Sequence, residues 1–349
     1  MKMWLLFALL GVVSASGAAG LLLRTDDEVA LDSPDDAAPV GDDSGASLGD
    51  MLDFAAPQGE SAADSEVDDT VIPDTDREGE FISSDTPVTA PVGERIELPD
   101  SGGAAVGDSG DDTLIGGAGN DWIEGEGGDD VLSGNGGDDM VTGGLGDDTL
   151  TGGDGRDSLF GSDGRDVLTG DHGDDSLVGG ADSDTLVGGE GNDTLSAGEG
   201  DDLLSGDEGA DLLMGGDGDD RLEGANLVDG DDGGTDTLNG GEGDDVLVLG
   251  AGDVAHGGEG ADSFLLGDWI DEGDPAIITD FTPGEDRLMV GFDTLSGEPE
   301  ITTLYDPETD SVGISLDGRL IAVLEGVQEV NVEAITLVRM NAISAPMSG

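Results

Sequence analysis

Carboxylates at a fixed spacing are the residues of this chain best suited to chemistry. From Gly107 to Glu223 the sequence is one nonapeptide written thirteen times without an insertion or a deletion. Aspartate occupies the sixth position of every copy and of three later copies. These sixteen candidate metal ligands are Asp112, Asp121, Asp130, Asp139, Asp148, Asp157, Asp166, Asp175, Asp184, Asp193, Asp202, Asp211, Asp220, Asp236, Asp245 and Asp262.

Calcium is the ion that these carboxylates fit best. Stacked repeats would bring the aspartates into register along an edge, where unneutralised carboxylates repel one another. Calcium removes this repulsion because it accepts six to eight oxygen ligands from carboxylates and backbone carbonyls. Zinc and copper prefer imidazole and thiolate, whereas the chain has only His172 and His256 and no cysteine. The sequence therefore predicts several bound Ca²⁺ ions.

The rest of the repeat defines the element that must position the carboxylates. Position eight is Leu, Ile or Val in all thirteen copies, and glycine holds positions one and four in twelve copies each. A short fixed period is typical of a solenoid whose repeats bury apolar side chains by stacking. We expect six-residue turns and three-residue strands, with two repeats per coil and about 4.8 Å between coils. At the two glycine positions, Asp182 and Ala197 are the exceptions, and we expect them to strain the turn.

The repeat resembles the Gly-Gly-x-Gly-x-Asp-x-U-x pattern, in which U is a large apolar residue, of the hemolysin-type RTX calcium-binding proteins. Good matches are 116–121, 188–193 and 240–245. The resemblance implies an all-β fold, a right-handed parallel β-roll in which the sixth-position aspartates and nearby carbonyls ligate calcium. Arg156 and Arg165 depart from the pattern at position five. Without calcium, the low aromatic content and high charge favour a disordered tract.

The composition shifts along the chain and predicts four regions. They are an apolar signal or anchor segment (1–23), a disordered acidic tether (24–106), the β-roll (107–265, interrupted at 224–230 and 249–256), and a β-rich C-terminal cap (266–349).

The cap is expected to cover the last apolar layer of the solenoid. Strand-like segments lie at 276–278, 286–290, 311–316 and 320–324. The segment 278–286 also resembles the stretch that follows the repeats in serralysin-like proteins. That resemblance implies a type I secretion signal in the C-terminal region.

The N-terminal segment indicates export. Trp4 to Leu23 is twenty residues without a charge, which is long enough to cross a bilayer. One alternative is a signal peptide cut between residues 14 and 19, and the other is an uncleaved membrane anchor. Three leucines at 21–23 lie beyond the cut and favour the anchor.

Charge narrows the function classes. A formal net charge of −73, from 10 basic and 83 acidic residues, excludes ordinary nucleic-acid binding. Because the chain has no cysteine, disulfides cannot stabilise it, which leaves metal binding as the means of stabilising an exported protein. We expect a structural or adhesion module that is extracellular or on the cell surface. The outward strand positions hold candidates for a binding or self-association surface, namely Trp122, Met140, Phe160, Leu203, Leu212 and Met214.

Enzyme activity is not expected, because the N-terminal region outside the repeats has no histidine from which a zinc site or a Ser-His-Asp set could be built. The alternative is a secreted hydrolase or another exoenzyme with its active site in the C-terminal region.

Overall fold

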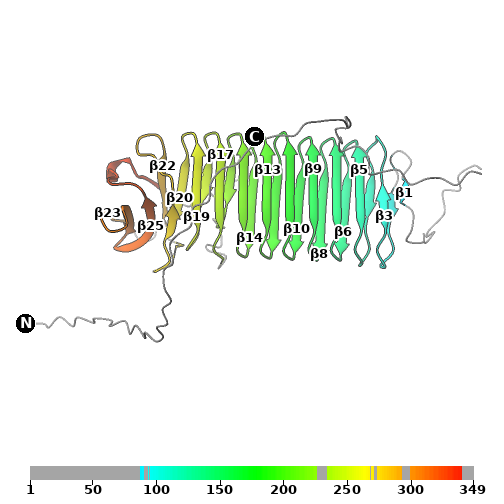
Figure 1. Ribbon diagram of the computed structural model, residues 1–349, viewed down its shortest axis with the longest axis horizontal. Coiled ribbons are helices and arrows are strands. Elements are labelled where there is room, and N and C mark those ends of the chain that lie inside the picture. Colours follow the sequence, from blue (N-terminus) through cyan, green and yellow to red (C-terminus); the bar gives the residue numbers. More distant parts are fainter. Residues whose placement is uncertain are drawn as a thin grey trace, which may run out of the picture. The chain divides into compact units, whose positions relative to one another are not determined.

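The repeats fold into a long β-solenoid made of two sheets (Figure 1). The structure is a computed structural model, and it describes residues 87–89, 93, 95–225, 234–267, 269–270, 273–292 and 299–339. The segments 1–23 and 24–86 lie outside the described residues, so the expected anchor and most of the expected tether are not addressed by it.

Odd-numbered strands form one sheet and most even-numbered strands form the other. The first sheet contains β1 (Val88–Thr89), β3 (Ala104–Val106), β5 (Trp122–Gly127), β7 (Met140–Leu145), β9 (Ser158–Asp163), β11 (Ser176–Ala181), β13 (Thr194–Glu199), β15 (Leu212–Asp217), β17 (Thr237–Glu242), β19 (Val254–Glu259), β21 (Ala276–Ile278), β25 (Arg319–Glu325), β24 (Ser311–Leu316) and β23 (Ile301–Asp306), in that spatial order. The second contains β2 (Arg95–Glu97), β4 (Thr113–Ile115), β6 (Val131–Gly136), β8 (Thr149–Asp154), β10 (Val167–His172), β12 (Thr185–Glu190), β14 (Leu203–Glu208), β16 (Arg221–Glu223), β18 (Val246–Val248), β20 (Ser263–Gly267), β22 (Arg287–Phe292) and β26 (Thr336–Arg339).

The register confirms that two repeats make one coil. Leu168 on β10 lies beside Leu150 on β8 and Leu186 on β12, each eighteen residues away and in parallel orientation. Because eighteen is twice nine, every position of the repeat stacks on the same position two repeats later.

Strands in the middle of the block are six residues long, twice the expected length. Pairing continues through positions one to three of the next repeat, although position two has positive φ, as at Asn135 (69°), Ser162 (94°) and Asp171 (75°). The turn is accordingly short. The left-handed backbone at Asp182 (φ 72°) agrees with the conformation expected there.

The core is a single column of eighth-position side chains for each sheet. Leu150, Leu168 and Leu186 are completely buried, whereas the flanking positions seven and nine are exposed or half-buried. Of the six outward residues singled out in the sequence, Trp122, Met140, Leu203 and Leu212 are exposed. The other two, Phe160 and Met214, are half-buried.

One leucine in this column should carry a large share of local stability. We expect Leu168→Ala to lower the free energy of unfolding by about 2–5 kcal/mol, because the cavity lies between two sheets that cannot collapse. The matched control Val167→Ala changes an exposed neighbour and should cost about 0.5 kcal/mol or less. Denaturant unfolding in millimolar calcium measures both, and equal losses would contradict a core confined to position eight.

The solenoid begins earlier than the sequence predicted. β2 and β3 lie within the expected tether, yet they pair with β4 and β5 as preceding coils. Ala105 fills the core position there, and Ile96 packs against the core from the coil before it. These strands lack the nonapeptide signature, but the N–H groups of Gly93 and Gly103 donate to Oδ1 of Asp112 and Asp121, so the early coils still join the aspartate ladders.

The two expected interruptions of the roll differ from each other in the structure. Across 224–230 the ladder spacing grows from eighteen to twenty-five residues, so the seven extra residues are inserted while the stacking register is kept. The segment 249–256 is a repeat shortened by one residue, which contributes the start of β19 and the buried Ala255. It therefore continues the roll.

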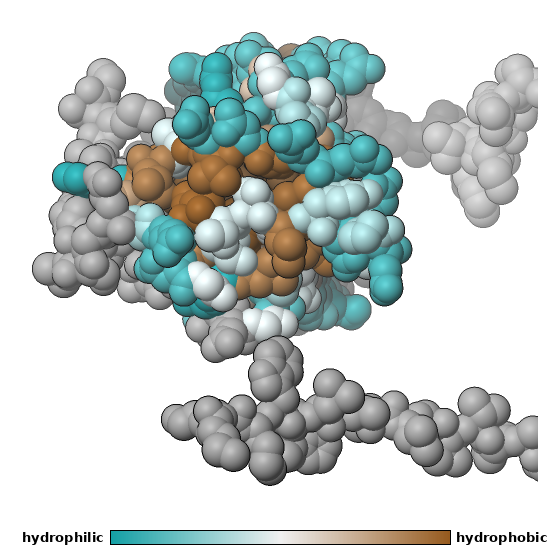
Figure 2. All heavy atoms as spheres, turned by 90° about the vertical axis from the view of Figure 1, so that its left-hand side faces the viewer, coloured by the Kyte–Doolittle hydropathy of each residue, from teal (hydrophilic) through white to brown (hydrophobic). Residues whose placement is uncertain are grey.

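The C-terminal region is partly solenoid and partly hairpin. β21, β22, β25 and β26 extend the two sheets in parallel, whereas β24 pairs antiparallel with both β25 and β23. Phe264, Ile314 and Leu324 belong to the same core cluster, so the C-terminal strands pack on the apolar core of the last coils. Figure 2 views this end and shows apolar atoms in the centre with hydrophilic atoms around them. Within the described part of the chain, no helix is long and apolar enough to cross a membrane.

Candidate metal centre

The sixth-position aspartates form two buried ladders, one along each edge of the solenoid. The backbone N–H of each aspartate donates to Oδ1 of the aspartate one coil later, as in Asp130 to Asp148 (2.8 Å) and Asp148 to Asp166 (2.7 Å). One ladder runs through Asp112, Asp130, Asp148, Asp166, Asp184, Asp202, Asp220, Asp245 and Asp262. The other runs through Asp121, Asp139, Asp157, Asp175, Asp193, Asp211, Asp236 and Asp253.

The structure thus places all sixteen predicted residues in the ladders and adds Asp253. This residue is almost completely buried, and its Oδ1 accepts the N–H of Asp236 at 2.9 Å. Counting in nines misses Asp253 because its repeat is one residue short. The motif Gly250-Ala251-Gly252-Asp253 was the signal that could have found it.

The interior rungs leave one carboxylate oxygen without a donor. Within the described residues, the buried Oδ2 atoms of the following aspartates have no hydrogen-bond partner: Asp130, Asp139, Asp148, Asp157, Asp166, Asp175, Asp184, Asp193, Asp202, Asp211, Asp220 and Asp245. A buried polar atom without a partner costs about 1–3 kcal/mol, and more when it is charged. Such a repeated row of donor-free oxygens is suited to binding cations.

The first rungs do not have this deficit. Oδ2 of Asp112 accepts the N–H of Asp108 at 2.9 Å, and Oδ2 of Asp121 accepts the N–H of Gly117 at 2.7 Å. Asp253 is likewise satisfied by the N–H of Gly250 at 2.5 Å. The carboxylates with a donor-free Oδ2 atom are therefore those of the interior coils.

Glycine at position one keeps the space beside Oδ2 open. A Cβ added at Gly143 would collide with both Oδ2 of Asp148 and the carbonyl oxygen of Gly161 in the next coil. At Gly161, Gly170 and Gly188, an added Cβ would collide with the equivalent aspartate Oδ2 and with the equivalent carbonyl oxygen of the next coil. A carboxylate oxygen and a carbonyl oxygen thus lie next to one point at each of these four turns.

This donor set fits calcium. No group of three or more His, Cys, Asp or Glu side chains in metal-binding arrangement occurs among the described residues. An ion at a turn must therefore take backbone carbonyls besides the aspartate, and a hard cation with many oxygen ligands suits that mixture. We assign Oδ2 of the interior aspartates and the first-position carbonyls as the groups that would hold it.

The electrostatics agree with a site that needs a cation. Burial is the largest cause, and neighbouring carboxylates of the same ladder a smaller one, of the rise of the pKa of Asp148, Asp157 and Asp193 to about 7. The backbone N–H bond to Oδ1 opposes this rise. At neutral pH, ionising the stacked carboxylates therefore costs free energy unless a positive charge lies beside them.

The residues at position five form a further, exposed set of stacked hydrogen bonds, called the outer ladder below, which was not predicted from the sequence. The N–H of Asp147 donates to Oδ1 of Asp129 (3.1 Å), and the N–H of Arg165 donates to Oδ1 of Asp147 (3.1 Å). In these bonds the N–H group donates to the preceding coil, which is the opposite direction to the bonds between the sixth-position aspartates. Coils that share both kinds of bond are therefore joined in both directions. Asp or Asn at position five in nine of the thirteen copies was the available signal.

The two arginines at position five belong to this outer ladder. Arg165 places Nη2 at 2.6 Å from Oδ2 of Asp147, and Arg156 places Nη2 at 3.4 Å from Oδ2 of Asp138. The Arg165 backbone and side-chain bonds lower the pKa of Asp147, which is the opposite of the shift at Asp148.

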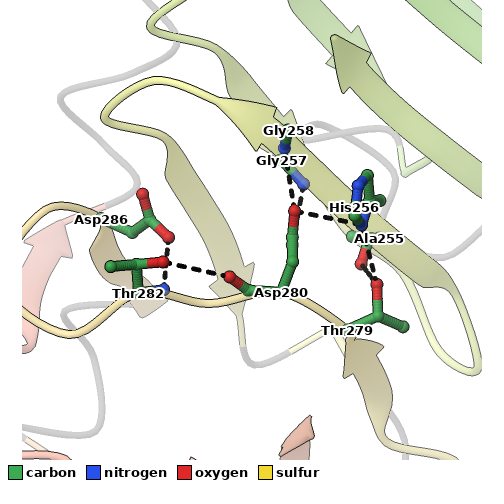
Figure 3. Close-up of polar contacts among 8 residues, drawn as sticks. All are labelled: Ala255, His256, Gly257, Gly258, Thr279, Asp280, Thr282 and Asp286. Atoms are coloured by element: carbon green, nitrogen blue, oxygen red, sulfur yellow. Dashed lines mark hydrogen bonds and ion pairs between the residues drawn. The ribbon is translucent and has the colours of Figure 1, made fainter. Parts of the chain in front are cut away.

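Protein donors satisfy two further carboxylates, Asp286 and Asp280, at the C-terminal end of the roll (Figure 3). Asp286 accepts the N–H of Asp262 at Oδ1 (3.1 Å) and the N–H of Thr282 at Oδ2 (2.6 Å). Asp280 accepts the N–H groups of Gly257 (3.0 Å) and Gly258 (2.9 Å), with His256 Nδ1 at 3.0 Å. These two carboxylates therefore need no cation.

A conservative substitution distinguishes the role of Asp148 as a calcium ligand from its role as a hydrogen-bond acceptor in the ladder. We expect Asp148→Asn to reduce the number of bound calcium ions by at least one, because the amide keeps an acceptor for Asp130 but loses the negative charge. The matched control Asp147→Asn changes a half-exposed residue of the outer ladder and should keep the full number. Calcium titration calorimetry measures both. The same loss in both variants would mean that diffuse charge holds the ions.

Comparison with known proteins identifies the repeat. The family model described as RTX calcium-binding nonapeptide repeat (4 copies) matches residues 106–141, 133–168, 142–177, 151–186, 187–222, 223–254 and 230–264. The matches end at residue 264, so the serralysin-like resemblance of 278–286 stays a prediction. No curated protein matches the chain.

Among solved structures, the chain is similar to the solution structure of the AlgE6R3 subunit from the Azotobacter vinelandii mannuronan C5-epimerase. The identity is 23%, the match covers 52% of this chain and 85% of that chain, and the TM-score is 0.20. We draw no conclusion about fold or activity from a likeness at that score.

Proposed function

Because residues 106–264 belong to the RTX calcium-binding repeats, we propose that the protein is an exported structural or adhesion module whose β-roll is assembled by calcium outside the cell. The observation that carries this proposal is the row of buried Oδ2 atoms in the interior coils, which lack any donor within the described residues. Calcium would occupy the space between these oxygens and the first-position carbonyls.

The calcium concentration on each side of the membrane would determine whether such a chain is folded there. Extracellular calcium modules bind with dissociation constants of about 10⁻⁴–10⁻³ M, far weaker than cytosolic sensors. Metal binding is folding free energy when the site exists only in the folded state. The repeats would therefore stay unfolded before export and fold after it.

The composition supports an extracellular location. The chain lacks cysteine, so calcium takes the part that disulfides have in many exported proteins. Export would use either the apolar segment Trp4–Leu23 or a type I signal in the C-terminal region, and the uncleaved anchor is our preferred alternative. The acidic stretch 24–86 would then separate the roll from the membrane.

We further propose that the protein is not an enzyme. Its two histidines occupy surface positions beside carboxylates: His172 lies between Asp154 (3.6 Å) and Glu190 (3.7 Å), and His256 contacts Asp280. The C-terminal region from residue 266 onward contains neither histidine nor cysteine. This distribution supports a binding module over a hydrolase.

Cell fractionation tests the location. We expect full-length protein starting at Met1 in the membrane fraction, and its release from intact cells by protease cutting within residues 24–86. Removal of calcium should make the roll itself protease-sensitive as well. A mature N-terminus between residues 14 and 20 would contradict the anchor, and protease protection in intact cells would contradict export.

A further inference from the structure

Position two of the repeat is glycine in the family pattern, but one row of the roll carries side chains there. The strand register stacks Asn135, Gly153, Asp171, Gly189 and Asp207 on one another, so a side chain alternates with a glycine. The three side-chain residues all have positive φ, at 69°, 75° and 66° in chain order. Residues other than glycine adopt this backbone infrequently, so the contacts of these side chains are informative.

Asn135 shows how far a position-two side chain reaches. Its Nδ2 donates to the carbonyl oxygen of Gly116, nineteen residues earlier, at 2.7 Å, and its Oδ1 accepts the hydroxyl of Ser133 at 3.3 Å. Gly116 is a first-position residue, and the coil before it has Gly103 in place of a ladder aspartate. An amide donor thus satisfies a first-position carbonyl that has no ladder carboxylate in the coil before it.

Asp207 has the same setting with the opposite chemistry. Its Oδ1 accepts the hydroxyl of Ser205 at 2.8 Å, as Oδ1 of Asn135 accepts that of Ser133. By this equivalence, Oδ2 of Asp207 takes the place of Nδ2 in Asn135 and lies toward the carbonyl oxygen of Gly188, again nineteen residues earlier. A carboxylate oxygen and a carbonyl oxygen are both acceptors, so they cannot bond to each other, whereas both can bind one cation.

The carbonyl oxygen of Gly188 already belongs to an interior turn of the ladder. A Cβ added at Gly170 would collide both with this oxygen and with Oδ2 of Asp175. Asp175 is 3% exposed, and its Oδ2 has no hydrogen-bond partner among the described residues. Asp207 therefore approaches, from the next coil, a place where a buried carboxylate oxygen and a carbonyl oxygen lie close together. The chain has an acceptor here, where a ladder carboxylate is present, and a donor at Asn135, where it is absent.

We propose that Asp207 is a second carboxylate ligand of the calcium ion held by Oδ2 of Asp175 and the carbonyl oxygen of Gly188. This ion is then bound more tightly than the ions at turns where position two is glycine, because calcium affinity depends on the number of charged ligands. Asp171 lies two coils earlier in the same row, where the same relation leads to Asp139. The inference rests on the proposed calcium-assembled roll and names the residue that makes its sites unequal.

A purely structural role for Asp207 leads to a different expectation. Asparagine would keep the hydrogen bond from Ser205, as Asn135 does with Ser133, and glycine would relieve the positive φ. Both variants would then bind calcium like the wild type. If Asp207 is a ligand, both variants lose a charged oxygen at the site.

Competition between the full-length chain and a chromophoric calcium chelator measures the tightest sites. Asp207→Asn and Asp207→Gly should each weaken one of these sites about tenfold or more, since loss of even an outer-shell partner costs about 10–100-fold in metal affinity. The matched control Glu208→Gln removes the same charge from the exposed neighbouring residue and should leave the tightest sites unchanged. Circular dichroism in millimolar calcium confirms that each variant is folded.

The outcomes separate this inference from the proposed function. Wild-type affinity in either Asp207 variant overturns the inference, and calcium-dependent folding of the wild-type chain would still stand. An equal loss in Glu208→Gln also overturns it, because diffuse charge would then set the affinity. A wild-type chain that binds no calcium overturns both the inference and the calcium-assembled roll.

Discussion

In a calcium chelator at neutral pH, the repeats should lose most of their β-structure, and millimolar calcium should restore it. Twelve buried Oδ2 atoms lack a donor in the described chain. At about 1–3 kcal/mol each, their cost reaches or exceeds the 5–15 kcal/mol by which a domain is usually stable. The single column of buried leucines cannot compensate, because ordering nine residues per buried leucine costs more backbone entropy than that leucine returns.

Far-ultraviolet circular dichroism during a calcium titration measures this transition. Magnesium at the same concentration is the control, because it requires near-octahedral geometry and releases its water reluctantly. It should produce a much smaller change. Identical spectra in chelator and in calcium would refute calcium-dependent folding, and an equal response to magnesium would mean that screening of the carboxylates suffices.

Most of the roll could be predicted from the sequence because each repeat carries its own local information. Leu150 and Asp148 occupy fixed places in a nine-residue frame, and a frame that closes a coil every two repeats fixes which residues stack. The inward leucine and the buried aspartate follow directly from that stacking. The glycines at positions one and four follow from the close approach of neighbouring coils.

Counting residues in nines could not predict how the stack accommodates a repeat that is longer or shorter than nine residues. The stack keeps its register through ladder bonds such as Asp236 to Asp253, so a repeat shortened by one residue still fits. The outer ladder depends on a bond direction that composition does not reveal, as between Asp147 and Arg165. The early coils at β2 and β3 have no carboxylate signature, and β23 and β26 of the cap lack any repeat to align.

Acid should substitute for calcium. Burial and neighbouring carboxylates raise the pKa of Asp148, Asp157, Asp184, Asp193 and Asp245 to about 7, from an ordinary value of 3.8. The folded chain therefore holds protons that the unfolded chain releases. Stability from this source is fully present below about pH 3.8 and is lost as the pH rises through about 7.

In chelator, lowering the pH from 7.5 to about 5 should therefore restore β-structure without any metal. In millimolar calcium the β-structure should persist at both pH values, while the number of bound ions falls on acidification because protons compete for the same oxygens. Circular dichroism follows the fold, calorimetry follows the ions, and sedimentation separates folding from acid-induced association. The control Asp148→Asn removes one of the titrating carboxylates and should weaken the acid effect. A metal-free chain that stays unfolded at pH 5, or one already folded at pH 7.5, would show that the buried carboxylates do not set the stability of the roll.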